Sequence, residues 1–188
     1  VSRGNSATWG VDSLAIDLAT GNLSPNDAVT TAPLGGSGLV ASPDGRFLFN
    51  TDSAVSGTAL PIRVDTVAGT LVTGTAAPTG GSPYRGAVDL GGKYLLVTND
   101  DGSSTLSRYR IDQSTGALTT MSAVTVGSRP YAVAFHPSNR FVYVGNYGDD
   151  SIHVLSFDAS TGAMTSVSTT SSVLTPDGIA VHPSGRFL

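Results

Sequence analysis

The chain of 188 residues contains no cysteine and no glutamate, and it has a single lysine and a single glutamine. Residue types that stabilise exposed helices are therefore scarce, which excludes a mainly helical protein. The absence of cysteine leaves the redox compartment open. Glycine (23 residues) and proline (10 residues) are abundant, and serine, threonine and valine recur throughout. This composition is typical of many short strands joined by tight turns.

No stretch of the chain concentrates positive charge, and no apolar stretch is long enough to span a membrane. The net charge is −4, with 14 acidic and 10 basic residues scattered along the chain, so we expect no nucleic-acid partner. Glycine, proline and threonine interrupt the apolar runs before they reach the length of a membrane span, so we expect no membrane insertion. No initiating methionine and no basic-then-apolar leader is present, so we expect a mature or trimmed product. Low lysine and high serine and threonine favour a secreted, periplasmic or cell-surface location.

An internal repeat runs through the whole chain. One marker is an aspartate followed four residues later by glycine, and its aspartates, 48, 47 and 46 residues apart, are Asp17, Asp65, Asp112 and Asp158. The second marker is a basic residue and an aromatic residue that open an apolar run, at 46–49, 93–96, 140–143 and 186–188. Two markers that keep one period four times define a repeat architecture.

Each repeat has the pattern of four short strands. Before each marker aspartate, apolar and polar residues alternate with a period of two, as in a strand with one buried face. The aspartate-to-glycine segment suits a hairpin loop, and a short apolar strand, such as 178–181 in the last repeat, leads through a proline turn into the basic-aromatic strand. Four antiparallel strands in about 47 residues form a β-propeller blade.

The predicted fold class is therefore all-β, a β-propeller in one domain with about four blades present. The expected divisions are a partial blade 1–36, blades 37–83, 84–129 and 130–175, and a partial blade 176–188.

The repeats carry recognisable motifs, Tyr-Val-Gly-Asn at 143–146, Leu-Val-Thr-Asn at 96–99, and His-Pro-Ser turns beginning at His136 and His182. With these motifs the chain resembles the YVTN-repeat propellers and the seven-bladed lactonase-like propellers, which include 6-phosphogluconolactonase-like enzymes and carboxymuconate cyclases. The resemblance covers the whole chain and implies part of a seven-bladed ring. Three explanations remain open: a piece of a longer propeller, a four-blade unit whose first and last strands share a blade, or a unit that pairs with a second copy in an eight-bladed ring.

The resemblance implies that a ligand binds at one mouth of the central channel. The loops that enter the innermost strands and those that join the second and third strands form this mouth. Residues near these loops give the candidate ligand-binding set: Arg85, Arg129, Tyr131, Asp177, Tyr84 and Tyr147.

Three members of this set, Arg85, Arg129 and Asp177, differ between repeats. A residue that the blade requires should recur, whereas one that a ligand requires need not. The arginines suit recognition of a carboxylate or phosphate, or form rim charges or ion pairs between blades. Asp177 is either a general base or a turn residue after a proline.

The catalytic residues remain unknown, because no nucleophile elbow, Ser/His/Asp spacing or metal-ligand spacing is found. We expect no metal and no cofactor. His136 and His182 share one repeat position and are predicted to make structural hydrogen bonds. The neighbouring aspartates of the second-to-third-strand loops are predicted to be solvated turn residues, and they are Asp100, Asp101, Asp149 and Asp150.

The sequence leads to three hypotheses about function, each of a different class. The first is a binding module for a small molecule, such as a lactone or sugar acid, or for a protein partner. The second, implied by the resemblance, is a lactone hydrolase whose site is completed by blades absent from this chain. In the family, a His-x-His segment enters an innermost strand. This chain departs from that pattern: the corresponding segments read Arg129-Pro130-Tyr131 and Pro176-Asp177, and the chain contains no glutamate. The third is a unit that forms a homodimer through open blade edges.

Overall fold

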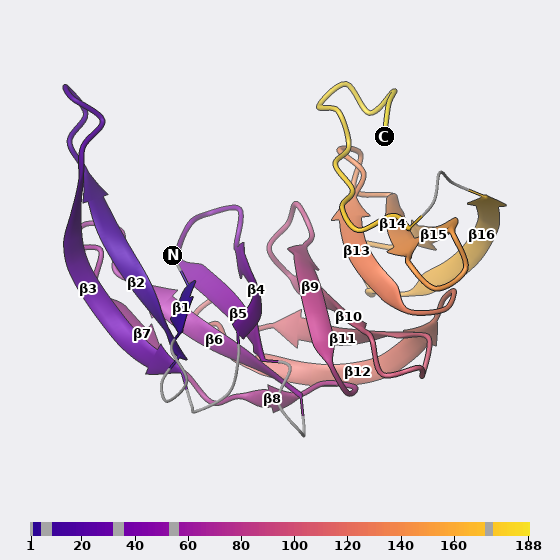
Figure 1. The fold of residues 1–188 in the computed structure, drawn as a ribbon, viewed down its shortest axis with the longest axis horizontal. Helices are drawn as coiled ribbons and strands as arrows, with labels where there is room; N and C mark the ends of the chain where they lie inside the picture. Colours follow the sequence, from indigo (N-terminus) through magenta and orange to yellow (C-terminus); the bar gives the residue numbers. More distant parts are fainter. Residues whose placement is uncertain (1, 5–8, 32–35, 53–56, 172–174) are drawn as a thin grey trace.

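The protein is described by a computed structural model, which covers residues 2–4, 9–31, 36–52, 57–171 and 175–188. These residues form strands, turns and bends and no helix, so none of them lies in a helix long and apolar enough to cross a membrane. The strands form four antiparallel sheets that follow one another along an open arc (Figure 1). The all-β propeller prediction is confirmed.

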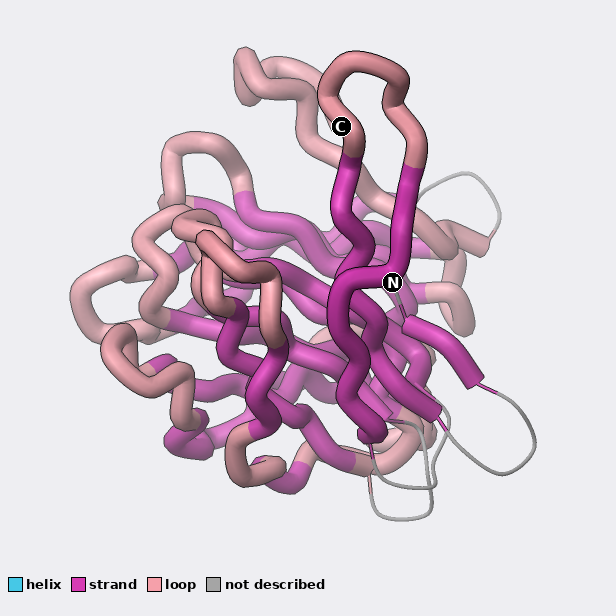
Figure 2. The backbone as a smooth tube through the Cα atoms, turned by 90° about the vertical axis from the view of Figure 1, so that its left-hand side faces the viewer, coloured by secondary structure: helices cyan, strands magenta, loops and turns pink. Residues whose placement is uncertain are grey.

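The first sheet has three strands and the next has five, counted in chain order. The first contains β1 (Ser2–Gly4), β2 (Trp9–Ile16) and β3 (Leu23–Thr31). The hairpin of β2 and β3 projects from one end of the arc (Figures 1 and 2). The second sheet contains β4 (Gly36–Ala41), β5 (Phe47–Asp52), β6 (Thr58–Val64), β7 (Leu71–Thr73) and β8 (Ala77–Pro78).

The third and fourth sheets each have four strands in sequence order. The third contains β9 (Pro83–Val88), β10 (Tyr94–Asn99), β11 (Thr105–Ile111) and β12 (Leu118–Thr125). The fourth contains β13 (Pro130–Phe135), β14 (Phe141–Asn146), β15 (Ser151–Phe157) and β16 (Met164–Ser171). The first strands of neighbouring sheets lie side by side, because β9 contacts both β4 and β13. These strands form the inner side of the arc.

The core consists of apolar side chains packed between successive sheets. All six residues of β10 are buried. Leu95 and Val97 pack toward the second sheet with Phe49, while Tyr94 and Leu96 pack toward the fourth. A strand buried on both faces needs apolar residues at every position rather than at alternate ones, which explains the continuous apolar run of β10.

The aspartate-to-glycine turns form as predicted, directly after β2, β6, β11 and β15. In the turn at 112–116, Asp112 Oδ1 accepts hydrogen bonds from the backbone N–H of Ser114 at 2.8 Å and of Thr115 at 3.0 Å. Gly116 closes the turn with a φ of 78°, the left-handed conformation that glycine adopts without a steric penalty. The repeat marker is therefore a property of the turn itself.

Proline divides the outer strand of the second sheet. Pro61 lies in the middle of β6 and has no N–H to donate to a neighbouring strand. Its carbonyl still accepts a bond from Gly74 at 2.8 Å, but the outer strand pairs with β6 only on either side, as β7 and β8. This blade therefore departs from the four-strand pattern.

The strands predicted at 178–181 and 186–188 are absent from residues 175–188, and those predictions were wrong. The turn between them does form, with the N–H of His182 bonded to the carbonyl of Phe187 at 2.9 Å. A strand requires a continuous ladder of backbone pairing, and the backbone-to-backbone hydrogen bonds of residues 175–188 are those that close the turn.

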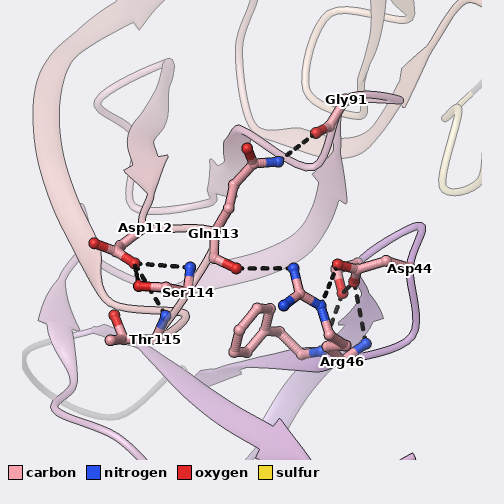
Figure 3. Close-up of polar contacts among 9 residues, drawn as sticks. Asp44, Arg46, Gly91, Asp112, Gln113, Ser114 and Thr115 are labelled. Atoms are coloured by element: carbon pink, nitrogen blue, oxygen red, sulfur yellow. Dashed lines mark hydrogen bonds and ion pairs between the residues drawn. The ribbon is translucent and has the colours of Figure 1, made fainter.

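Side-chain hydrogen bonds at the turn end of the blades join turns of the same sheet and of neighbouring sheets. The Arg46 guanidinium donates from Nη2 to the carbonyl of Gln113 at 2.8 Å, and Gln113 Nε2 donates to the carbonyl of Gly91 at 2.8 Å (Figure 3). His136 Nε2 lies 2.9 Å from the carbonyl oxygen of Gly185, and His182 Nδ1 lies 2.8 Å from Ser184 Oγ. The predicted structural hydrogen bonds of both histidines are confirmed.

Candidate functional site at the channel mouth

The opposite end of the blades, where strands β9 and β13 begin, brings most of the candidate residues together. Tyr84 and Tyr131 each directly follow a buried proline that opens an innermost strand, Pro83 and Pro130. Tyr147 directly follows β14. The loop before β13 and the loop after β14 are hydrogen-bonded to each other here: the N–H of Tyr147 donates to the carbonyl of Arg129 at 2.9 Å.

The three tyrosines form one stack, which we call the tyrosine ladder (Tyr84, Tyr131 and Tyr147). The ring centroids of Tyr84 and Tyr131 are 4.5 Å apart with an interplanar angle of 26°. Those of Tyr131 and Tyr147 are 4.7 Å apart with an angle of 24°. Near-parallel rings at this spacing stabilise one another beyond their buried area. Because Tyr84 belongs to the third sheet and Tyr131 to the fourth, the ladder crosses between blades.

Arg129 holds the ladder through an ion pair with Asp100. Its Nε lies 2.8 Å from Asp100 Oδ1 and its Nη2 lies 3.2 Å from Oδ2, so the pair is bidentate. The same Nη2 donates to the Tyr131 hydroxyl at 2.9 Å, and the guanidinium carbon lies 5.4 Å from the Tyr131 ring and 5.0 Å from the Tyr147 ring. Such a planar, five-donor group can make all these contacts at once.

The charges of this group shift its pKa values. The hydrogen bond and charge of Asp100 raise the pKa of Arg129 above its ordinary value. The pKa of Tyr131 is raised first by desolvation and then by its hydrogen bond to Asp100 and the charge of that carboxylate. Both shifts mean that Arg129 and Tyr131 hold their protons more strongly than the same side chains do in water. Arg129 also has a φ of 50°, a left-handed conformation that is uncommon for a residue with a Cβ.

Arg85 lies at the other end of the ladder and is a free cation. Its guanidinium carbon is 5.2 Å from the Tyr84 ring, and no carboxylate of the described residues lies within ion-pair distance of it. Its backbone is fixed, because its N–H donates to the hydroxyl of Thr98 at 3.0 Å. The side chain is exposed, so the charge is available to a ligand.

A hollow of about 380 Å³ lies beside Arg85 along the innermost strands and includes Asp177 among its lining residues. Ala132 and Gly178, which also line it, occupy the position two residues after the proline that Arg85 occupies in its own blade. Small residues at these two positions leave room in front of the arginine. Asp177 is exposed and makes no hydrogen bond to another described residue. The hollow therefore combines one free cation with one free carboxylate.

Five of the six candidate residues thus belong to one cluster, the tyrosine ladder with its two arginines, and Asp177 faces the hollow that Arg85 lines. Of the two roles considered for Arg129, its contacts are those of an ion pair between blades. The role of Asp100 was missed: its side chain is only 16% exposed and holds Arg129. One signal could have identified it, because Asp100 occupies the same repeat position as Tyr147.

The other aspartates at this end tie loops together. Asp101 Oδ2 accepts the N–H of Gly81 at 2.7 Å, Asp149 Oδ2 that of Ser128 at 2.9 Å, and Asp150 Oδ1 that of Thr175 at 2.7 Å. They are loop-to-loop contacts rather than merely solvated turn residues. In the described part of the chain no three His, Cys, Asp or Glu residues are grouped in a way that could hold a metal ion.

Comparison with known proteins adds a family to this geometry. The family model described as lactonase, 7-bladed beta-propeller matches residues 8–135 and 127–188. No curated protein matches the chain. Among solved structures, a candidate 6-phosphogluconolactonase from Bacteroides uniformis superposes with a TM-score of 0.81 at 16% identity, over 98% of this chain and 60% of its own length. A functionally unknown protein from Desulfotomaculum acetoxidans has a TM-score of 0.79 at 17% identity, over 98% of this chain and 59% of its own.

These identities are low, so the superpositions establish the fold rather than the chemistry. The chain spans about 60% of the length of both structures. The family model, by contrast, matches nearly all of the chain. The chain therefore belongs to the lactonase family of seven-bladed β-propellers.

Proposed function

We propose that the channel mouth binds a small hydroxylated anion of the sugar-acid or lactone class. The observation that carries this proposal is the free guanidinium of Arg85, which lies against Tyr84 and lines a hollow of about 380 Å³. Arginine recognises carboxylates and phosphates with paired donors. The carboxylate of Asp177 in the same hollow accepts hydrogen bonds from ligand hydroxyls.

Tyr84 supports this role of Arg85. A guanidinium that lies on an aromatic face loses fewer conformations on binding than one that moves freely in water. The ladder fixes Tyr84 through Tyr131, and Asp100 with Arg129 fixes Tyr131. The cluster therefore presents Arg85 in a defined position.

Hydrolysis of a lactone is the second candidate, and two observations favour it: membership of the lactonase family and the placement of Asp177 with Arg85 in one hollow. In this reaction Asp177 would accept a proton from the water that attacks the lactone carbonyl, and Arg85 would stabilise the oxyanion. The ring C–O bond then breaks, and the leaving oxygen takes a proton to give the hydroxy acid. The remaining blades of the ring would supply further groups at the channel.

The binding proposal is tested by calorimetric titration of the chain with gluconate and 6-phosphogluconate. Loss of a charge-assisted hydrogen bond costs about 1.5–3 kcal/mol, so Arg85→Ala should weaken binding by about tenfold or more. Arg140→Ala, an exposed arginine at the opposite end of the blades, is the matched control and should leave the affinity unchanged. Equal affinity of Arg85→Ala and the parent chain would contradict the proposal.

Hydrolysis is tested separately by following the opening of glucono-δ-lactone and its 6-phosphate at constant pH. Asp177→Asn should abolish any rate above the uncatalysed one while leaving gluconate binding within a few-fold of the parent. A rate that persists in Asp177→Asn would remove this residue from the reaction, and no rate in the parent chain would leave binding as its function.

A further inference from the structure

A second polar hollow lies at the other end of the third sheet, far along β10 from the tyrosine ladder. We call it the lysine groove. It has a volume of about 510 Å³, and its lining includes Lys93, Arg110, Asp112, Ser114 and Ser160. Ser160 comes from the aspartate-to-glycine turn of the fourth sheet, so the groove runs between two blades.

The cation at the groove is free because of one exchange within the repeat. In the second sheet, Arg46 is paired with Asp44 at 2.7 Å and also donates to the carbonyl of Gln113 (Figure 3). In the third sheet, Lys93 takes the place of Arg46, and Gly91 takes the place of Asp44. The carboxylate that would pair with the cation is therefore missing from this position, and Asp89, the other carboxylate of the turn, accepts backbone N–H groups, including that of Lys93 at 2.6 Å. No carboxylate of the described residues lies within ion-pair distance of the Lys93 ammonium.

A second free cation stands on the same face of the blade. Arg110 is opposite Tyr94 in the pairing of β10 with β11, which places both side chains on the face toward the fourth sheet. Arg110 is exposed and has no ion-pair partner among the described residues. The equivalent position of the fourth sheet is Ser156, so only the third sheet of these two combines a free lysine with a free arginine.

The hydroxyls of the groove are oriented to accept rather than donate. Ser114 Oγ gives its proton to Asp112 Oδ1 at 2.6 Å, and Ser160 Oγ gives its proton to Asp158 Oδ1 at 2.6 Å. Each serine oxygen keeps lone pairs that only a donor can satisfy. A ligand that fits the groove therefore carries hydroxyl donors as well as a negative group.

We propose that the lysine groove binds an acidic sugar residue, with Lys93 and Arg110 on its carboxylate or phosphate and the oxygens of Ser114 and Ser160 accepting from its hydroxyls. This site is separate from the channel mouth. A groove of about 510 Å³ is large enough to hold a sugar ring, and the two cations of its lining, Lys93 and Arg110, outnumber its one carboxylate, Asp112.

The site is tested by titrating the 15N-labelled chain with galacturonate, with glucose 6-phosphate and, as the neutral counterpart, with galactose. We expect both acids to shift the amide signals of residues 112–116 and 158–162, and galactose to shift them far less. The affinities of galacturonate and glucose 6-phosphate show whether the groove prefers a carboxylate or a phosphate. Failure of both acids to bind, or equal binding of galactose, would overturn the proposal.

Single substitutions then test whether Lys93 and Arg110 bind the acid. Lys93→Ala and Arg110→Ala should each weaken binding of the preferred acid about tenfold, as expected for the loss of a charge-assisted bond. The control is Arg140→Ala, which removes the cation at the equivalent position of the fourth sheet, where no second arginine stands opposite. Far-ultraviolet circular dichroism and the unfolding midpoint verify that each variant is folded. Binding that survives Lys93→Ala and Arg110→Ala in folded protein would overturn the proposal.

Arg85→Ala separates this proposal from the function of the channel mouth. We expect Arg85→Ala to leave the shifts at 112–116 and 158–162 unchanged. If Arg85→Ala abolishes them instead, the acid binds at the channel mouth and the lysine groove is not a site.

Discussion

The two ends of the blades differ in how their residues are used. At the turn end, the same aspartate and glycine recur in every repeat and make the same bonds, as at Asp65 and Asp112. At the ladder end, Tyr84 and Tyr131 share one repeat position, but Arg129 stands where the third sheet has Ser82, and Tyr147 stands where it has Asp100. The exchanged residues, rather than the repeated ones, supply the ion pair of Arg129 with Asp100 that joins the two sheets. The exchange of Asp44 for Gly91 shows that the same reasoning applies within the turn end.

The largest loss of stability should come from adding a side chain to a turn glycine that packs against the neighbouring blade. A Cβ on Gly116, at a φ of 78°, would lie 2.5 Å from Phe47 Cδ1, a ring that is 2% exposed. We expect Gly116→Ala to lower the free energy of unfolding by about 3 kcal/mol, from left-handed strain together with overpacking.

The matched control is Gly21→Ala. Gly21 has a φ of 74° and nothing within 4 Å of its Cβ position, so only strain acts and the loss should be about 1 kcal/mol. Urea unfolding measures both. Equal losses would mean that contact between the blades contributes nothing at this turn.

The second largest loss of stability should come from acid, which protonates the aspartates of the turns. Hydrogen bonds from Ser114 and Thr115 lower the pKa of Asp112 to about 2, and bonds from Ser160 and Thr161 lower that of Asp158 to about 2, from an ordinary value of 3.8. A lowered pKa in the folded state adds stability above the unfolded value, and this stability is lost as the pH falls toward 2. The urea midpoint should therefore decline between pH 4 and pH 2.

Asp112→Asn and Asp158→Asn together should make that decline shallower, because asparagine keeps an acceptor oxygen but has no proton to bind. The double variant should be less stable than the parent at neutral pH and closer to it in acid. A decline of unchanged steepness would assign the acid sensitivity to other carboxylates.

The smallest effect is expected at the ladder end and concerns a single proton. Removing the Asp100 charge by Asp100→Asn should lower the pKa of Tyr131, because that carboxylate disfavours the tyrosinate. Spectrophotometric titration of the tyrosines measures the change. Tyr109, whose pKa is raised to about 12 by burial, serves as an internal control and should titrate as before. An unchanged Tyr131 would mean that Asp100 acts only on Arg129.

Sequence patterns were sufficient for the blades but not for the contacts between them. The turn at Asp112 and the buried strand β10 follow from residues close together in the chain, so their period and polarity predict them. The bidentate pair of Arg129 with Asp100 joins residues of different sheets, and nothing local specifies such a partner. The repeat places the loops of residues 84, 85, 129, 131 and 147 at one end of the fold, but the stacking of the tyrosines among them is not predictable from spacing.

The segments 178–181 and 186–188 show the opposite case, in which the sequence predicts strands that the structure does not contain. Their apolar residues match those at the equivalent positions of β13 and β14, but an apolar run describes a segment that can be buried and does not supply the neighbouring strand. Propensity alone therefore predicts strands only where the pairing partners are also in place.

The proline in β6 affects how the molecule behaves at high concentration. An outer strand with a continuous row of unpaired N–H and C=O groups can template pairing with another molecule. By dividing the outer strand of the second sheet into β7 and β8, Pro61 leaves no long edge there. The outer strands of the other three sheets remain undivided: β3 has nine residues, and β12 and β16 have eight each. Intermolecular strand addition, the first step of edge-to-edge aggregation, should therefore begin at one of these sheets rather than at the second.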